Sequence, residues 1–570
     1  MRLKNRLNTY PKEPRKDLRD LVRVSAENHP DKALYVYKKN KQEYRCTYSE
    51  FYQGINRLGT AFKAMGLEGA HIAVIGETHP YYTMTYLATV GGNGVIIPLD
   101  REISEEQIIN FLEFSDAEAV VYSDKFNELF ARESEKLSKI RAFIPMFPAE
   151  DTPKDDRFVA FEDALAKGRE IMDAGDTSFT EKELDLDKLA AIIFTSGTTS
   201  TSKGVMLSHR NLISAANASV ATMAHYNDDN RFVSVLPIHH TYDMTCEQLG
   251  IIALGASQLV NDSLKHTLKN FAAFKPTGLV LVPLFLETMH RKIWEEIRRR
   301  GMEKKVRFAM KLNAALLAVG IDMRKKFFGQ VTAAFGGELE SIVCGGAPIS
   351  PDIILDFYHF GITVLEGYGI TECSPLVAVN RAGQTKLGSV GLPVPGVTVK
   401  IDKTEGEETG EILVKGPNVM LGYYKNEEIT KEVFTDDGYF RTGDIGYMDE
   451  DGYIFITGRK KNIILLSNGK NIFPEEIEEY VRKIPGVLEN VVVGRTPEGG
   501  TTAITAIIVP DMQHDAVKDM DADALHAYFK EKIHETNKHL PLYKRIGDLE
   551  IRMEEFEKNT SRKIKRFLIK

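Results

Sequence analysis

Short apolar runs alternate with amphipathic stretches along much of the chain. A helical pattern from Pro80 to Val90 separates the first two of these runs. Strands that alternate with helices indicate βαβ units and parallel sheet, and continuous apolar strands are usually covered on both faces. The sequence therefore predicts an α/β fold whose large N-terminal part stacks parallel or mixed sheets against helices. The predicted strands are 71–75, 94–98, 117–122, 141–145, 189–193, 278–282, 341–344 and 362–365.

The pattern changes near Gly388, where short alternating strands and Gly-containing turns take over, as in 410–414 and 452–456. This alternation is typical of an antiparallel or β-barrel-like subdomain. After Gly458 a small α+β segment begins, and Pro474 followed by two glutamates suits the first turn of a helix. We expect an N-terminal domain over 1–457 and a small, mobile C-terminal α+β domain over 458–570.

Composition narrows the class of protein. The chain has 570 residues, of which 43% are hydrophobic and 27% charged, as in an ordinary globular protein and unlike a disordered or collagen-like chain. Its net charge of −8 makes general nucleic-acid binding unfavourable. The four cysteines form no CxxC pair, which predicts neither a zinc ribbon nor a disulfide framework and fits a reducing cytosol. The N-terminus lacks the apolar core of a signal peptide, and no apolar run approaches the roughly 20 residues of a membrane span. We expect a cytoplasmic protein, with peripheral membrane contact left open.

Residues 194–204, FTSGTTSTSKG, are almost entirely Ser, Thr and Gly and follow the apolar run 189–193. Hydroxyls and unobstructed backbone N–H groups can surround phosphate oxygens, and Lys203 adds a positive charge. A flexible linker is the alternative, although linkers rarely follow a buried strand directly. A Walker loop is excluded because its second Gly and its Ser/Thr would fall on Ser202 and Gly204.

Further segments with candidate chemistry follow in a fixed order. They are LPIHH at 236–240, CGGAP at 344–348, GYGITE at 367–372, YFRTGD at 439–444, GRKK at 458–461, SNGKNI at 467–472 and TSRKIKR at 560–566. Each has an ordinary structural alternative when taken alone: His240 could be a hydrogen-bonded core histidine, and Lys563 lies in a basic tail that could be solvated. The ordered series is much harder to attribute to chance.

Taken together, these segments resemble the motifs of the adenylate-forming (AMP-binding) enzymes, a superfamily of acyl-CoA synthetases, peptide-synthetase adenylation domains and firefly luciferases. The resemblance runs from about residue 20 to 566. The chain departs from the usual motifs at Ser200 and Ser202, which replace Gly and Pro, and at Thr560 and Arg562, which also replace Pro and Gly. The resemblance implies that a carboxylic acid and ATP form an acyl-adenylate with release of pyrophosphate, and that a thiol then displaces AMP.

The resemblance also implies residue roles. ATP phosphates would be bound by Thr195, Ser196, Gly197, Thr198, Thr199, Lys203 and Thr371. Adenine and ribose would be bound by Gly345, Gly346, Ala347, Pro348, Gly367, Tyr368, Gly369, Asp444 and Arg459. His240 would border the acyl pocket, Lys461 would be the hinge residue, and Gly469 would line the CoA tunnel. Lys563, Glu372 and Lys203 would be catalytic, with Mg²⁺ held by Glu372 and by Thr195 as a second oxygen ligand.

Physical chemistry makes these roles coherent. Adenylate formation crowds negative charges, so cations must neutralise them, and catalysis depends on positioning and electrostatics. Lys203, Lys563 and Mg²⁺ at Glu372 suit that task. By analogy with the family, the two half-reactions use one site in turn, and the C-terminal domain rotates about a hinge at 458–461.

The segment 283–337 carries a long helical pattern, which resembles long-chain fatty-acid–CoA ligases more than compact aryl or amino-acid ligases. Between Arg291 and Lys326 basic residues outnumber acidic ones by twelve to four, and Phe308, Leu312, Leu316 and Val319 recur at helical spacing. These features are typical of a packed helix with a solvated basic face. The alternative is a surface that meets anionic lipid.

The first functional interpretation is an AMP-forming long-chain fatty-acid–CoA ligase whose partners are fatty acid, ATP and CoA. Within enzymes, the alternatives are a ligase that uses an acyl carrier protein, which presents the same thiol, and a ligase for another hydrophobic acid. From another class, a catalytically silent lipid or nucleotide sensor remains open. The presence of Lys203, Glu372, Asp444 and Lys563 favours an enzyme.

Overall fold

The computed structural model describes residues 2–3, 7, 9–39, 42–150, 152–195, 203–466, 471–496, 502–558 and 564–569. The chain divides into two compact units. The first unit contains Met1–Gly197, Thr201–Thr398 and Lys415–Gly438, and the second is built mainly from Val399–Val414 and Tyr439–Lys570. Each unit is described by itself.

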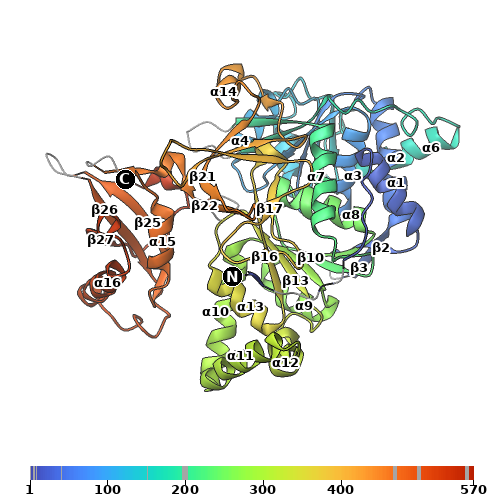
Figure 1. Ribbon diagram of the computed structural model, residues 1–570. Coiled ribbons are helices and arrows are strands. Elements are labelled where there is room, and N and C mark those ends of the chain that lie inside the picture. The colour runs from blue at the N-terminus through green and yellow to red at the C-terminus, as the bar shows by residue number, and fades with distance from the viewer. Residues whose placement is uncertain are drawn as a thin grey trace. The chain divides into compact units, whose positions relative to one another are not determined.

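A seven-stranded sheet forms one layer of the first unit (Figure 1). Its middle is parallel, as the alternating pattern predicts, and the antiparallel strands β9 and β20 extend one edge. Helix α3 (Pro80–Gly91) contacts β4 and β5; Pro80 occupies its first turn, and the His79 ring accepts a hydrogen bond from the Tyr81 N–H at 3.2 Å. The strand order is β20 (Gly422–Tyr423), β9 (Lys203–Ser208), β8 (Leu189–Thr195), β5 (Val95–Leu99), β4 (His71–Ile75), β6 (Ala119–Tyr122) and β7 (Ala142–Pro145).

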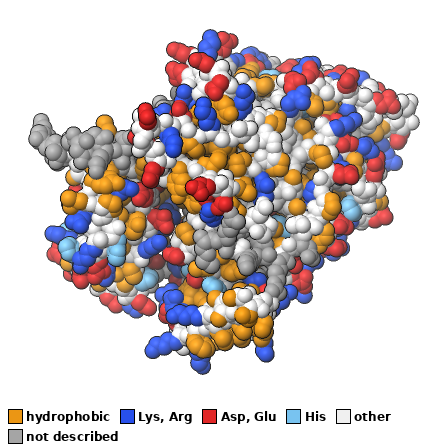
Figure 2. Space-filling view, in the orientation of Figure 1, with side chains coloured by type: hydrophobic (Ala, Val, Ile, Leu, Met, Phe, Trp, Pro, Cys, Tyr) orange, Lys and Arg blue, Asp and Glu red, His pale blue; other side chains and the backbone are white. Residues whose placement is uncertain are grey.

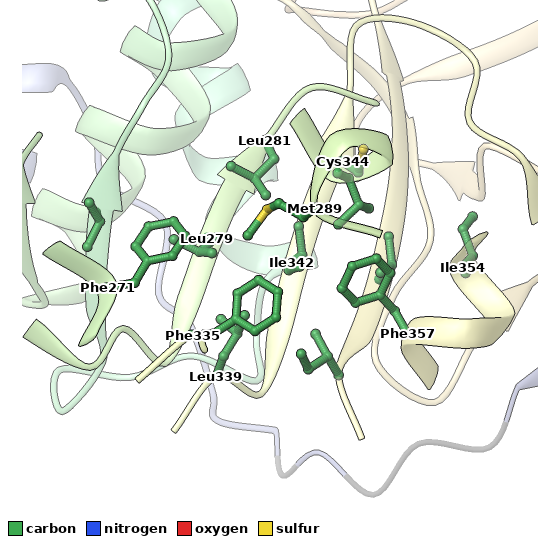
Figure 3. Close-up of a cluster of buried hydrophobic side chains, with 14 of the residues drawn as sticks. Phe271, Leu279, Leu281, Met289, Phe335, Leu339, Ile342, Cys344, Ile354 and Phe357 are labelled. Atoms are coloured by element: carbon green, nitrogen blue, oxygen red, sulfur yellow. The ribbon is translucent and has the colours of Figure 1, made fainter. Parts of the chain in front are cut away.

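A five-stranded sheet carries the second group of predicted strands. Its order is β12 (Gly278–Leu281), β13 (Ser341–Gly345), β14 (Thr363–Gly369), β15 (Leu376–Val379) and β17 (Leu392–Pro393). β12 to β14 are parallel, and β15 and β17 continue antiparallel. Figure 3 shows the apolar core against this sheet, in which Phe357 of α13 (Pro351–Phe360) and Met289 of α10 (Pro283–Arg299) pack with Ile342. Burying one such side chain contributes about 1.5–3 kcal/mol, so the core holds β13 and β14 together up to the register pair Gly345 and Gly367.

The predicted helical segment consists of three helices, α10, α11 (Glu303–Ala318) and α12 (Arg324–Ala333). α10 and α11 both contact α13. A third sheet of the first unit has the order β10 (Arg231–Ser234), β11 (Ser257–Val260), β2 (Ala33–Lys39) and β3 (Gln42–Thr47). Helix α2 (Tyr48–Ala64) begins directly after β3, where the Thr47 side chain and Glu50 form a reciprocal cap.

The second unit contains the alternating strands predicted after residue 388. β18 (Thr398–Asp402), β19 (Gly410–Lys415), β21 (Phe440–Met448) and β22 (Ile454–Arg459) form a four-stranded sheet, with antiparallel pairing of β19, β21 and β22. A three-stranded sheet, β25 (Val487–Arg495), β26 (Ala503–Pro510) and β27 (Asp548–Ile551), packs with α15 (Pro474–Arg482) and α16 (Ala522–Asn537). α15 begins at Pro474 as predicted. The fold class, mixed α/β with a large N-terminal and a smaller C-terminal domain, is confirmed.

Two sequence expectations concern the whole chain. All four cysteines are buried and free of disulfides. Within the described ranges, none of the helices combines the length and the apolar character that crossing a bilayer requires.

Candidate active site

The two arms of the predicted phosphate loop lie side by side. β8 ends at Thr195 and β9 begins at Lys203, and these two residues face each other in an antiparallel pair. The Thr195 hydroxyl points to the Lys203 carbonyl at 3.5 Å. The loop therefore leaves and re-enters the sheet at one place, as a loop that encloses phosphate oxygens requires.

Tyr423, from the neighbouring edge strand β20, links the two charged residues predicted for this site. The Lys203 ammonium lies 4.8 Å from the centre of the Tyr423 ring, within range of a cation–π attraction. The Tyr423 hydroxyl donates a hydrogen bond of 2.9 Å to Glu372 Oε1. Burial, and then the adjacent Glu372 carboxylate, raises the pKa of Tyr423 well above its ordinary value, so this hydroxyl remains a donor.

Glu372 and Thr371 lie in the short helical turn η4 (Thr371–Cys373), directly after β14. The Met420 N–H donates to the Glu372 carbonyl at 2.8 Å, so the backbone of this turn is fixed to the segment that leads into β20. Glu372 is half-buried. Its carboxylate presents hard oxygen donors, which fit Mg²⁺.

Glycines at the ends of β13 and β14 bring two backbones close together. Gly345 and Gly367 are register partners, and a Cβ on Gly345 would lie 3.0 Å from the Gly367 carbonyl oxygen. A Cβ on Gly369 would meet the Pro375 carbonyl oxygen at 2.2 Å. These contacts explain Gly345 and Gly369 by backbone packing, because a side chain at either position would meet a neighbouring carbonyl oxygen. Tyr368 between them is buried, which leaves little of its ring for a base in this conformation.

His240 precedes the π-helix η2 (Tyr242–Leu249). Its Nδ1 accepts a hydrogen bond from the Tyr242 N–H at 3.2 Å. The Tyr242 hydroxyl in turn lies 3.2 Å from the Val343 carbonyl oxygen of β13. Two hydrogen bonds through Tyr242 therefore connect His240 to the sheet that contains Gly345.

Two carboxyl groups that the sequence did not single out are fully buried in η2. The side chains of Asp243 and Glu247 lie within hydrogen-bonding reach of each other. Asp243 Oδ1 and Glu247 Oε2 receive no donor from the described part of the chain, and a proton held between the two carboxyls would supply one. Burial raises the pKa of both carboxyls above the ordinary range.

In the second unit, Asp444 and Arg459 are partners on adjacent strands. They face each other in the β21–β22 register, and Arg459 Nε lies 2.6 Å from Asp444 Oδ1. The buried carboxylate predicted to bind ribose is thus paired with the guanidinium predicted to contact the nucleotide. Lys461 follows in the turn η5 (Lys460–Asn462), where burial, and then Arg459, lowers the pKa of its ammonium group.

The structure brings Lys203 and Glu372 to Tyr423, with Thr195 opposite Lys203 on the adjacent strand, and it brings Asp444 next to Arg459. Ser196, Gly197, Thr198, Thr199, Gly469 and Lys563 lie outside the described residues, as do the substituted positions Ser200, Ser202, Thr560 and Arg562. Sequence reasoning missed Tyr423, which is separated from Glu372 by 51 positions and stands in no motif. It also missed Asp243 and Glu247, although acidic residues four apart in an apolar segment are an available signal.

Comparison with protein families identifies two matching regions. Residues 22–424 match the family described as AMP-binding enzyme, and residues 461–570 match the AMP-binding enzyme C-terminal domain. A long-chain-fatty-acid–CoA ligase of Mycobacterium bovis is 30% identical over 450 residues, covering 75% of this chain and 71% of that protein. A chloroplastic long-chain-fatty-acid–[acyl-carrier-protein] ligase of Arabidopsis thaliana is 26% identical over 87% of this chain and 76% of its own length.

Solved structures match the fold. ATP-bound MatB of Rhodopseudomonas palustris superposes with a TM-score of 0.75 at 24% identity, covering 97% of this chain and 98% of its own. The anthranilate CoA ligase AuaEII, in complex with anthranoyl-AMP, gives a TM-score of 0.77 at 18% identity, covering 98% of this chain and 97% of its own. At these identities the likeness concerns the fold alone.

Proposed function

Because the chain belongs to the AMP-binding enzyme family, we propose that it is an AMP-forming ligase that activates a long-chain fatty acid with ATP and transfers the acyl group to the thiol of CoA. The observation that carries the proposal is the cluster around Tyr423. It holds a cation, Lys203, and a carboxylate, Glu372, at the mouth of a Ser/Thr/Gly loop. Names of relatives support the substrate class.

In the first half-reaction a carboxylate oxygen of the fatty acid attacks the α-phosphorus of ATP, and pyrophosphate leaves with the bond electrons. Lys203 and the loop 195–203 would bind the phosphates. Glu372 and Thr195 are the residues that would hold Mg²⁺, which supplies charge neutralisation when bound. The Tyr423 hydroxyl would orient Glu372, and Asp444 with Arg459 would bind the ribose and the nucleotide.

In the second half-reaction the CoA thiolate attacks the acyl carbonyl carbon, and AMP leaves. By the resemblance, the segment that contains Gly469 lines the pantetheine tunnel, and Lys461 is the hinge residue. We propose that the N-terminal domain ends at residue 457 and that the mobile C-terminal domain begins at residue 458. A cytosolic location is proposed as well, and the four free cysteines support it.

An acyl carrier protein is the second candidate acceptor, because one relative is named as a ligase for that partner. Another hydrophobic acid also has support, since a feruloyl-CoA synthase of Amycolatopsis is 28% identical over 85% of this chain. A silent lipid or nucleotide sensor is the alternative of another class.

The test is pyrophosphate release from Mg-ATP with fatty acids of graded length, with and without CoA. We expect release to peak at long chains and to accelerate with CoA. Release without acceleration by CoA would favour a carrier protein, a peak with a compact aryl acid would change the substrate class, and ATP binding with no release from any acid would indicate a sensor.

Lys563→Ala separates the two half-reactions. We expect adenylate formation to fall by roughly 10²–10³, as for loss of one preorganised charge, while thiol transfer from a supplied acyl-adenylate is less affected. Lys565→Ala, a nearby lysine whose ammonium lies 3.8 Å from Glu557, is the matched control and should retain both rates. An equal loss of both half-reactions in Lys563→Ala would contradict the assigned role.

A further inference from the structure

Helix α11 has apolar residues on two opposite faces. Met310 and Asn313 are buried on its inner side. On the outer side Phe308 is 67% exposed, Leu312 41% and Val319 72%. The packed-helix interpretation of the sequence assigned these same residues to the core, and for these three it is wrong. Positions four and seven residues apart share a helix face, so the exposed side chains form one continuous stripe.

Two further apolar residues are exposed near the ends of α11. Met302, just before the helix, and Ile321, just after it, are exposed as well, but helical geometry does not place them on the stripe itself. Contiguous apolar patches with a polar rim are common at interaction sites, whereas single exposed apolar residues need no explanation. Figure 2 shows hydrophobic side chains gathered over the lower helices of the view, α10–α12, with Lys and Arg at their edge.

Lysines border the stripe. Lys304, Lys305 and Lys311 are exposed, and by helical geometry they lie beside Phe308 and Leu312. In the part of the chain that the structure describes, no carboxylate lies within ion-pair distance of these three ammonium groups. The neighbouring acids are instead engaged by arginines: Glu296 by Arg299 and Arg300, Glu303 by Arg307, and Asp322 by Arg324.

We propose that this stripe and its three lysines, here called the α11 surface, dock on an anionic lipid membrane with the helix lying in the interface. An apolar stripe bordered by lysines suits that position, because the apolar side chains enter the acyl boundary while the ammonium groups meet anionic headgroups. A second copy of the chain is a less suitable occupant, because it would bring the same positive charges together. Docking through the α11 surface would place a ligase beside fatty acid held in the membrane. That benefit rests on the proposed function, whereas lipid binding by the α11 surface does not.

The experiment is co-sedimentation of the full chain with sonicated vesicles, without ATP or CoA. Vesicles of phosphatidylcholine with about 30 mol % phosphatidylglycerol are compared with pure phosphatidylcholine, at about 0.05 M and 0.5 M salt. We expect binding to the anionic vesicles, weakened at high salt, and at least about tenfold weaker binding to the neutral ones.

Two variants test the two components of the α11 surface. Phe308→Ser with Val319→Ser keeps the charge and should weaken binding at least about tenfold, because both side chains lose their apolar burial. Lys304→Gln, Lys305→Gln and Lys311→Gln together should weaken it by roughly 10² at low salt. Neither change touches a buried side chain, so both variants should fold normally.

Matched controls come from the second unit. Leu542 is 79% exposed and Met553 61%, so changing both to Ser removes equally exposed apolar side chains. Lys403, Lys530 and Lys538 are exposed, and their triple change to Gln removes the same charge. Both controls should bind anionic vesicles like the unaltered chain.

Three results would overturn the proposal: no binding to anionic vesicles, binding that ignores lipid charge and salt, or equal binding by the α11 variants and the unaltered chain. Self-association abolished by the Phe308 and Val319 changes would reassign the surface to a second copy. A ligase without vesicle binding would refute only this surface, whereas vesicle binding without pyrophosphate release would refute only the proposed function.

Discussion

The hydroxyl of Tyr423 contacts one carboxylate oxygen of Glu372, and its ring lies beside Lys203. Tyr423→Phe keeps the ring and removes only the donor. A hydrogen bond to a charged group contributes about 1.5–3 kcal/mol, so we expect a roughly 10- to 100-fold slower adenylation step. Because Tyr423 acts through Glu372, the Mg²⁺ concentration that gives half-maximal rate should also rise, while the KM for fatty acid stays constant.

The adjacent Tyr424 provides the matched control. Its hydroxyl donates to Asp116 Oδ2 at 2.8 Å, and the ion pair with Lys425 and the hydrogen bonds around it lower the pKa of Asp116 to about 2. Tyr424→Phe removes an equivalent hydrogen bond outside the cluster and should leave the Mg²⁺ dependence unchanged. Parallel shifts in both variants would show that the tyrosines support only the local fold.

At the scale of elements, η2 contains a pair of carboxyls whose ionisation opposes folding. Burial raises the pKa of Asp243 and Glu247 in the folded chain, so the folded state holds more protons than the unfolded state above the ordinary carboxyl range. The contribution of the protonated pair to the free energy of unfolding is therefore fully present at low pH and is lost as pH rises. We expect the pair to cost about 1–3 kcal/mol of unfolding free energy between about pH 5 and pH 8.

Glu247→Gln removes one ionisation while its amide can still hydrogen-bond Asp243. Urea unfolding at the two pH values should show a smaller loss of stability in this variant than in the unaltered chain. Glu128→Gln, at an exposed position of α5 (Asn127–Glu133), is the control and should keep the original pH dependence. An unchanged pH dependence in Glu247→Gln would show that the pair does not stay protonated.

The elements also show what a sequence can predict. Strands such as β4 and β12 follow from continuous apolar runs, and α15 follows from Pro474 and the two glutamates after it, because these signals are local. The exposed stripe of α11 could not be predicted, since helical spacing gives the angular position of Phe308 and Val319 but not which face meets the core. Tyr423 was missed for the same reason: only the pairing of β20 with β9 brings it to Lys203.

At the scale of the whole molecule, the proposed cycle requires the C-terminal part to adopt two positions, and Lys461 tests this requirement. Proline fixes φ near −65°, so Lys461→Pro should hold one position. We expect adenylate formation to stay within about threefold and thioester formation to fall by roughly 10², the cost of misplaced reacting groups. Lys461→Ala removes the ammonium but keeps backbone rotation, so it should retain both rates. Pyrophosphate release reports adenylate formation and acyl-CoA release reports thioester formation. The ratio of these two rates is compared between variants whose thermal unfolding is the same. Equal loss of both steps in Lys461→Pro would mean that the hinge lies elsewhere in the chain.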